Sequence, residues 1–197
     1  MIYLASGSPR RRELLNQMGV AHEVLMPVHG GEAVDETPHA GENPEAYALR
    51  VAREKAEAGW ARLLACGLSV HPVLAADTTV AVDEIILGKP VDAAEAARFL
   101  RLLSGREHRV ISAVVLKEGA RSAQRTSITR VWFNHLSDAD VEHYIATHEY
   151  CDKAGGYALQ GHAGGFITRI EGSPSGVMGL PLFETAQLLQ LFETGAP

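Results

Sequence analysis

The stretch IYLASGSPRRRELLNQMG, residues 2–19, predicts a strand, a glycine turn and a helix in immediate succession. Residues 2–5 are apolar and typical of a short strand. Ser8 and Pro9 suit the N-cap and the first position of a helix, and Gly19 suits its C-terminal end. Units of this kind build α/β proteins, so the stretch predicts an α/β fold.

Three arginines, Arg10, Arg11 and Arg12, fall on the first turn of this helix, where the helix dipole favours carboxylates instead. A bound anion would explain them, because a glycine turn before a helix offers N–H donors and arginine binds phosphate oxygens bidentately. Successive helical positions point in different directions, so at most two arginines can face one ligand. We favour Arg10 and Arg11, with Ser6 in the same turn; a basic surface turn without a ligand is the alternative.

The remaining sequence alternates between helical and extended patterns. It predicts helices at 44–65, 93–105, 138–148 and from Pro181, strands at 72–77, 109–119, 122–133 and 164–170, a hairpin turning at Asp83 and Glu84, and loops at 29–44, 151–156 and 171–179. Helices interleaved with strands, some of them joined as hairpins, predict an α/β fold with a mixed sheet. We expect residues 1–197 to form a single domain.

Composition excludes several classes of protein. The 197 residues carry 18 Lys and Arg against 24 Asp and Glu, a net charge of -6, which argues against a chain that coats nucleic acid. Cys66 and Cys151 have neither a metal-ligand spacing nor the density of a disulfide scaffold, which suits a reducing compartment. No stretch approaches a membrane span. We expect a cytoplasmic protein that binds neither nucleic acid nor membranes.

Two carboxylates are candidate ligands for a divalent metal. Asp77 is predicted to end a strand, which is where open α/β sheets place their ligands, and Glu36 lies in the polar loop. Together they could hold Mg²⁺, which binds one or two carboxylates plus substrate phosphates. Lys55 and Lys89 could neutralise phosphate oxygens. The alternatives are a turn aspartate, a solvated loop glutamate and lysines that only cover apolar surface.

Seven motifs carry a resemblance to a known family: LASGSPRRRELL, VDET, RVAREKA, AADTTV, LGKP, DKAGGYALQG and VMGLPLFET. They occur in the order seen in the Maf family, over essentially the whole chain. The resemblance implies a nucleoside triphosphate pyrophosphatase with an elongated mixed β-sheet flanked by helices, similar to the inosine triphosphate pyrophosphatases. The DKAG.Y..QG pattern resembles the dTTP/UTP pyrophosphatase branch.

The same resemblance implies roles for individual residues. It makes Asp77 the proton acceptor and Arg10, Thr78 and Gln160 the residues that select the substrate. It places Glu36, Lys55 and Lys89 around a divalent cation, Mg²⁺ or Mn²⁺, and the phosphates. The chain departs from the branch pattern at Gly156 and Ala158 and in the loop 29–41, which is longer than usual. It also departs in GHAGGF, residues 161–166, where His162 is expected to alter the pocket wall.

The function predicted from these residues is hydrolysis of dTTP or UTP, or of modified pyrimidine nucleotides, to the monophosphate and pyrophosphate. A nucleotidyltransferase is one alternative, because LASGSPRR faintly resembles the arginine loop of those enzymes. A nucleotide-sensing regulator of cell division is another, because the family has been linked to inhibition of septum formation. An aspartyl-phosphate phosphatase fits less well, since no second aspartate follows two residues after Asp77. We expect a homodimer.

Overall fold

The structure is a computed structural model that describes residues 1–26 and 34–194. Its strands are β1 (Ile2–Leu4), β2 (His22–Val24), β3 (Val73–Val82), β4 (Ile85–Leu87), β5 (Glu107–Glu118), β6 (Arg121–Phe133) and β7 (Ile167–Glu171). Its α-helices are α1 (Pro9–Gln17), α2 (Pro44–Ala65), α3 (Ala93–Leu103), α4 (Asp138–Ala146), α5 (Pro174–Met178) and α6 (Leu182–Glu193), and two short 3-10 helices are η1 (Ala154–Gly156) and η2 (His162–Phe166). Residues 29–33 of the predicted loop lie outside the described residues.

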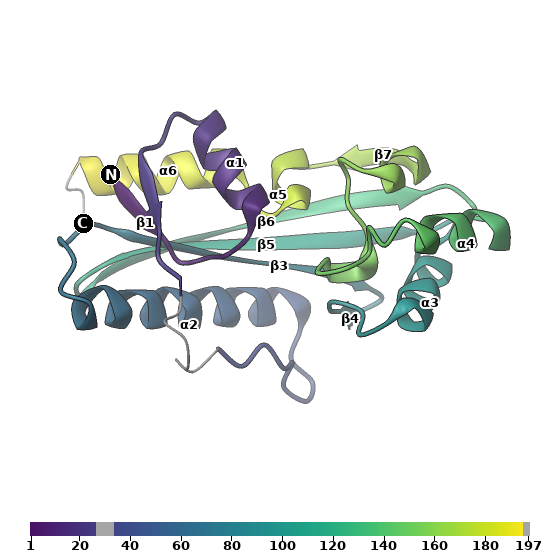
Figure 1. Ribbon diagram of the computed structural model, residues 1–197, viewed down its shortest axis with the longest axis horizontal. Helices are drawn as coiled ribbons and strands as arrows, with labels where there is room; N and C mark the ends of the chain where they lie inside the picture. The colour runs from purple at the N-terminus through teal and green to yellow at the C-terminus, as the bar shows by residue number, and fades with distance from the viewer. Residues whose placement is uncertain (27–33, 195–197) are drawn as a thin grey trace.

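The strands form one mixed sheet in the order β2-β1-β3-β5-β6-β7, with β4 pairing to β3. The β1 strand is parallel to β2 and β3, and the other pairs are antiparallel. In Figure 1 the long strands β3, β5 and β6 run along the molecule, α2 covers one face of the sheet, and α1 and α6 cover the other. The predicted α/β fold with an elongated mixed sheet and flanking helices is confirmed.

Alternation along β3 decides which face each side chain meets, because successive strand residues point to opposite sides. Leu74 and Ala76 pack in the core against α1 and α6, whereas Ala75 packs in the core against α2. By the same alternation Asp77 points toward α2 and Thr78 toward the opposite face. One strand thus supplies polar groups to both faces of the sheet at the same level.

The edge of β3 that faces β1 is open in the middle. The β1 strand pairs with β3 only at Val73 and Leu74, and β4 pairs with β3 only from Val80 onward. Among the described residues no strand covers the stretch between, residues 75–79. The chain leaves β1 through a glycine turn and enters α1 beside this gap (Figure 1). The middle of β3 therefore has no neighbouring strand on this edge, while its other edge stays paired with β5.

Local signals placed the main helices correctly. The Asn43 side chain accepts a hydrogen bond from the Ala46 N–H at 2.7 Å, and the helix that follows spans Pro44–Ala65, as predicted. Ser137 caps α4 in a reciprocal capping box with Asp140. The hairpin turn at Asp83 and Glu84 is confirmed, since both residues have positive φ, as a two-residue turn between right-twisted strands requires.

Three expectations about element boundaries were wrong. The predicted strand 72–77 does not end at Asp77; β3 continues to Val82, because its pairing with β5 runs without interruption from Val73 to Ala81. The predicted loop 171–179 contains the short helix α5, which Ser173 caps through the Gly176 N–H. The predicted strand 164–170 begins only at Ile167, because the residues before it form η2.

No helix among the described residues is both long and apolar enough to cross a membrane.

A buried histidine ties the far end of the sheet to the loop after α4. His108 in β5 is 2% exposed, and its Nε2 lies 2.8 Å from the hydroxyl of Tyr157. The ring also packs edge-on against Phe133, with centroids 5.0 Å apart. Burial lowers the pKa of His108 from its ordinary 6.5 to about 4, so the ring is neutral at physiological pH.

We expect this histidine to make the protein sensitive to acid. Between pH 6.5 and about 4 the unfolded chain binds a proton at His108 that the folded chain does not, so stability falls as the pH falls. The loss reaches about 3 kcal/mol. His108→Gln can keep the bond to Tyr157 but cannot titrate, so its melting temperature should fall less between pH 7 and pH 4 than that of the parent. Parallel pH profiles of the two proteins would contradict this.

Candidate active site

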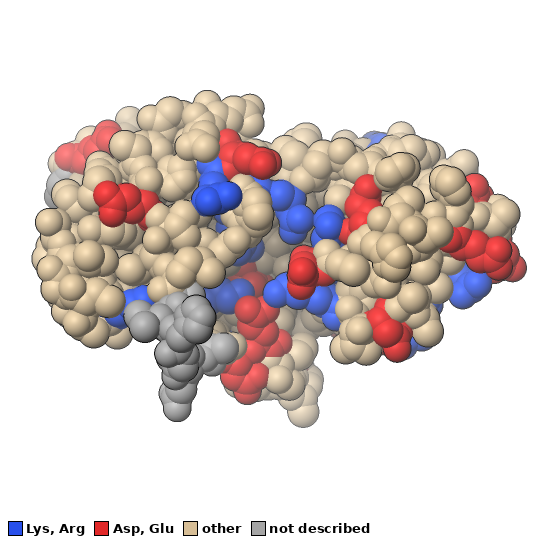
Figure 2. All heavy atoms as spheres, in the orientation of Figure 1, with Lys and Arg blue, Asp and Glu red and all other residues tan. Residues whose placement is uncertain are grey.

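A cavity of about 540 Å³ lies at the open edge of β3. Figure 2 shows lysines and arginines gathered along the hollow in the middle of this face of the molecule. All nine predicted site residues line the cavity, although they come from six different parts of the chain: Ser6, Arg10, Arg11, Glu36, Lys55, Asp77, Thr78, Lys89 and Gln160. The fold therefore brings the predicted residues together.

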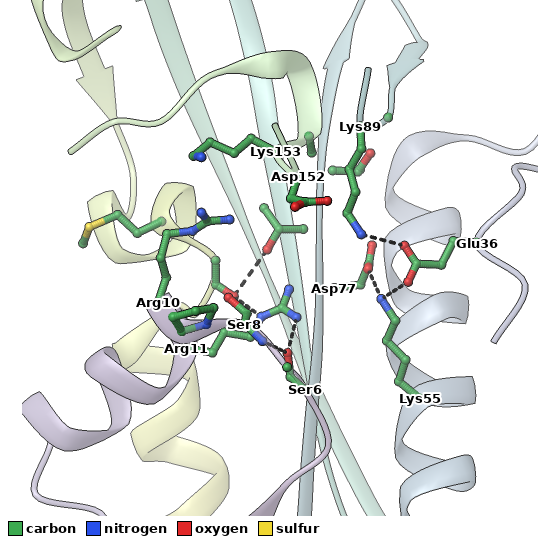
Figure 3. Close-up of a pocket in the computed structure, with 18 of the residues that line it drawn as sticks. Ser6, Ser8, Arg10, Arg11, Glu36, Lys55, Asp77, Lys89, Asp152 and Lys153 are labelled. Atoms are coloured by element: carbon green, nitrogen blue, oxygen red, sulfur yellow. Dashed lines mark hydrogen bonds and ion pairs between the residues drawn. The ribbon is translucent and has the colours of Figure 1, made fainter. Parts of the chain in front are cut away.

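Lys55 lies between the two carboxylates (Figure 3). Its Nζ is 2.7 Å from Oδ1 of Asp77 and 2.8 Å from Oε1 of Glu36. The second oxygen of Glu36 lies 3.6 Å from Nζ of Lys89. Burial alone would raise the pKa of Glu36, but the hydrogen bond and charge of Lys55, aided by Lys89, lower it below its ordinary value. Glu36 is thus held ionised, and an oxygen of each carboxylate points at the Lys55 ammonium.

Asp77 is the buried member of this group. Its side chain is 8% exposed, against 39% for Glu36. Oδ1 accepts from Lys55, and none of the described residues donates a hydrogen bond to Oδ2. A charged oxygen without a donor is costly in a protein interior unless it faces solvent or a ligand. This oxygen is therefore the atom of Asp77 that is free to take a proton or hold a metal.

Glu36 and Asp77 are the residues that could hold a divalent metal together with a bound substrate. Oxygens from Glu36 and Asp77 converge on the Lys55 ammonium, so one cation already sits where they meet. Among the described residues no group of three or more His, Cys, Asp and Glu could enclose a metal. Mg²⁺ commonly binds through one or two carboxylates and completes its shell with water and phosphate oxygens, which this pair permits.

The α1 wall of the cavity presents Arg10 and Arg11 (Figure 3). Arg11 is fixed: its Nε donates to the Gly179 carbonyl at 2.8 Å and its Nη1 to the Ser6 hydroxyl at 3.0 Å. Burial lowers the pKa of Arg11, and the charge of Arg10 lowers it further, although Asp77 opposes both. Arg10 forms no hydrogen bond or ion pair with a described residue. Arg12 is exposed and lies outside the cavity, as predicted.

Hydroxyl groups lock the turn before α6 onto the sheet. Thr78 Oγ1 lies 2.7 Å from Ser112 Oγ, which donates to the Gly176 carbonyl at 2.7 Å. Thr78 also reaches the Gly179 carbonyl at 3.4 Å, the same carbonyl that Arg11 holds. Because Ser112 gives its proton to Gly176, Thr78 donates its single hydroxyl proton to this wall, and only the lone pairs of its oxygen can accept a hydrogen bond from a ligand in the cavity. Ser112 was not predicted, because a serine in an apolar strand gives no sequence signal.

The opposite wall comes from the loop after α4. Gly155 has φ +68° and donates its N–H to the Gly88 carbonyl at 3.0 Å, and a Cβ there would lie 2.8 Å from Val80. This close packing places Asp152 and Lys153 at the cavity, where Lys153 lies across from Arg10 (Figure 3). Burial and the charge of Arg10 lower the pKa of Lys153. The DKAGGYALQG motif, residues 152–161, thus contributes Asp152, Lys153 and Gln160 to the cavity.

Gln160 lies at the mouth of the cavity on an exposed turn. The expectation that His162 alters the pocket wall was wrong: His162 lies outside the cavity lining and pairs with Glu149 at 3.0 Å. Two polar lining residues on α2 were missed, Tyr47 and Arg62. Tyr47 lies eight residues before Lys55, on the same side of the helix, so the spacing could have found it. Nothing marks Arg62 in the sequence.

Fold and site together define a class: an α/β protein with a cation-lined cavity around a buried carboxylate, an arrangement suited to phosphorylated ligands. The chain belongs to the Maf family, since the family described as Maf-like protein matches residues 1–192.

Individual relatives are similar over their whole length. A dTTP/UTP pyrophosphatase of Aromatoleum aromaticum is 56% identical over 196 residues, which cover 97% of this chain and 95% of the relative. A dTTP/UTP pyrophosphatase of Chromobacterium violaceum is 54% identical over 191 residues, covering 97% and 94%. Among solved structures, a HAM1 protein from Coxiella burnetii matches with a TM-score of 0.49 and 14% identity, covering 99% of this chain and 98% of the other.

Proposed function

We propose that this protein hydrolyses dTTP and UTP to the nucleoside monophosphate and pyrophosphate. The observation that carries the proposal is the position of Asp77. Its Oδ2 receives no hydrogen bond from a described residue, and Asp77 lines a cavity that cations from four parts of the chain also line. Relatives of this protein at 50–56% identity are named dTTP/UTP pyrophosphatases, which supports the proposal that this protein acts on the same substrates.

Cations from four parts of the chain line the cavity. Arg10 and Arg11 come from α1, Lys55 from α2, Lys89 from the turn after β4, and Lys153 from the loop after α4. Apart from Glu36, Asp77 and Asp152, no acid lines the cavity among the described residues, so positive charge dominates. Arg10 and Lys153 face each other without an acid between them, and a phosphate chain would relieve their repulsion.

The proposed reaction displaces pyrophosphate by water. Water attacks the α-phosphorus, a new P–O bond forms, and the bond from the α-phosphorus to the bridging oxygen breaks with its electron pair leaving on pyrophosphate. Asp77 accepts the proton of the water through Oδ2, while Lys55 holds Oδ1 and fixes the carboxylate. Lys89, Arg10 and Arg11 bind the departing phosphates. A divalent ion held by Glu36 and Asp77 would supply charge neutralisation at the phosphates.

Base selection is proposed to rest with Gln160, at the mouth of the cavity and beside Tyr157 in the same loop. A primary amide offers both a donor and an acceptor, which matches the N3–H and carbonyl edge of uracil and thymine.

A panel of canonical and modified triphosphates, assayed for pyrophosphate with Mg²⁺ and Mn²⁺, tests the reaction and the base together. We expect dTTP and UTP to release pyrophosphate with no second substrate, and excess EDTA to stop the release. A requirement for a sugar phosphate would indicate a nucleotidyltransferase. Tight dTTP binding with negligible turnover would indicate a nucleotide-sensing regulator. Full activity in EDTA would remove the metal from the proposal.

We further propose that the protein acts in the cytoplasm. Both cysteines, Cys66 and Cys151, are free and exposed, a state that a reducing compartment preserves. The homodimer stays a prediction, which the molecular mass in solution would test.

Replacing Arg10 should weaken substrate binding without destabilising the fold. Arg10→Ala removes a cation that contacts no acid and opposes the α1 dipole, so the melting temperature of the free protein should not fall. Each charged hydrogen bond lost to the triphosphate should cost about 1.5 to 3 kcal/mol of binding. Arg12→Ala, one residue along the same turn and outside the cavity, is the matched control. A large drop in melting temperature for Arg10→Ala would show a structural role instead.

A further inference from the structure

One carboxylate outside the cavity holds the turn that carries Gln160. Glu149 follows α4 and its side chain is 17% exposed. Its Oε2 accepts from the backbone N–H of His162 at 2.9 Å and lies 3.0 Å from Nδ1 of the same residue. Its Oε1 accepts from the hydroxyl of Tyr144 at 3.2 Å. Glu149 thus connects α4 to the start of η2 and does not line the cavity.

The turn itself rests against this carboxylate. The Gly161 N–H donates to the Ala158 carbonyl at 3.2 Å, which closes a four-residue turn with Gln160 as its third residue. A Cβ on Gly161 would overlap the Glu149 carboxylate. The φ of Gly161 is -114°, a value open to other residues, so a larger residue here would displace the Glu149 side chain rather than strain the backbone.

The carboxylate is ionised in this position. Burial alone would raise the pKa of Glu149, but the backbone N–H of His162, the His162 side chain, Tyr144 and the Ala163 N–H together lower it. Hydrogen bonds to a charged acceptor are roughly twice as strong as neutral ones. The hydrogen bonds to the ionised Glu149 thus fix a turn that lies on the protein surface.

We propose that Glu149 is a positioning residue for base selection: it fixes the turn 158–161 so that the Gln160 amide is held at the cavity mouth. This inference rests on the proposed function, in which Gln160 contacts the base. Glu149 bonds to none of the residues proposed to bind the departing pyrophosphate, which are Arg10, Arg11 and Lys89. Lys153, whose pKa the charge of Glu149 raises, is the cavity cation that it influences.

The test separates the base from the phosphates. Glu149→Ala should raise KM for dTTP about tenfold, the scale of one mispositioned contact, with kcat retained. The inhibition constant of pyrophosphate, which has no base, should not change. Glu149→Gln keeps an acceptor oxygen for the His162 N–H and should recover most of the loss. Glu142→Ala removes the same charge from an exposed position of α4 and should have no effect.

Two further variants make the inference falsifiable even if Glu149→Ala folds poorly. Gly161→Ala should raise KM for dTTP in the parent protein but add little in Glu149→Ala, where the clash is gone. In the double variant Glu149→Ala/Gln160→Ala, KM for dTTP should be no higher than in Gln160→Ala alone. If Gln160→Ala leaves KM for dTTP unchanged, base selection by Gln160 fails. If Gln160→Ala raises KM but Glu149→Gln and Glu149→Ala do not, or if the pyrophosphate constant rises in step with KM, the role of Glu149 alone is overturned.

Discussion

Asp77→Asn is expected to lose on the order of 10² to 10⁴ in turnover, the contribution of a general base, while the protein keeps its fold. The amide is nearly isosteric with the carboxylate, and the backbone pairing of Asp77 with Ala113 in β5 does not depend on the side chain. An amide oxygen can still accept from Lys55, so the 2.7 Å contact survives in weaker form. Single-turnover rates with saturating dTTP and metal would measure the loss directly.

The control for this variant lies on the same hairpin. Asp83→Asn makes the same chemical change at an exposed turn position whose positive φ asparagine tolerates. It should leave turnover unchanged. Wild-type turnover in Asp77→Asn, with an unaltered melting temperature, would remove Asp77 from the proton transfer and leave the cavity as a binding site.

Gln160→Glu is expected to lower kcat/KM for dTTP and UTP by about 10² or more, because a carboxylate cannot donate to the base carbonyl and leaves one polar group unpaired. Gln160 is exposed on its turn, so the substitution should cost little stability. Gains on methylated guanine nucleotides should be small, since the rest of the cavity wall is unchanged. The amide can present its donor and acceptor in either order, so cytosine is not excluded by Gln160 alone.

Gln187→Glu is the matched control, because it adds the same charge at an exposed position of α6 that is outside the cavity lining. Activity on dTTP equal to that of the parent in Gln160→Glu would show that Gln160 does not contact the base. The proposed preference for pyrimidines would then rest on the relatives alone.

The helices were predicted well where a cap and a periodic apolar face coincide. The α2 helix is the clearest case: Asn43 and Pro44 mark its start, and Tyr47, Val51 and Lys55 mark the face that packs on the sheet. The α5 helix was missed because Pro174, Ser175 and Gly176 are typical of loops, and only the cap at Ser173 and packing against the sheet make five residues helical.

The error at β3 has a different cause. A charged residue inside an apolar run suggests the end of a strand, yet Asp77 sits in the middle of one, because Lys55 on α2 and the open edge of the sheet accommodate its charge. Neither feature can be read from neighbouring residues. For the same reason the cavity wall at Arg62 and Gly179, and the support that Ser112 gives to Thr78, depend on contacts between distant segments.

The open edge of β3 also bears on the order in which the chain folds. The β5–β6 hairpin pairs residues that are near in sequence across a two-residue turn, from Glu118 and Arg121 outward, so little entropy is lost in closing it. The pairing of β1 with β3 joins Tyr3 to Val73, a distant contact that costs more and is expected to form late. The first strand, which delivers Arg10 and Arg11, would therefore dock last. Until it does, an intermediate exposes an unpaired strand edge, and aggregation during refolding should begin there.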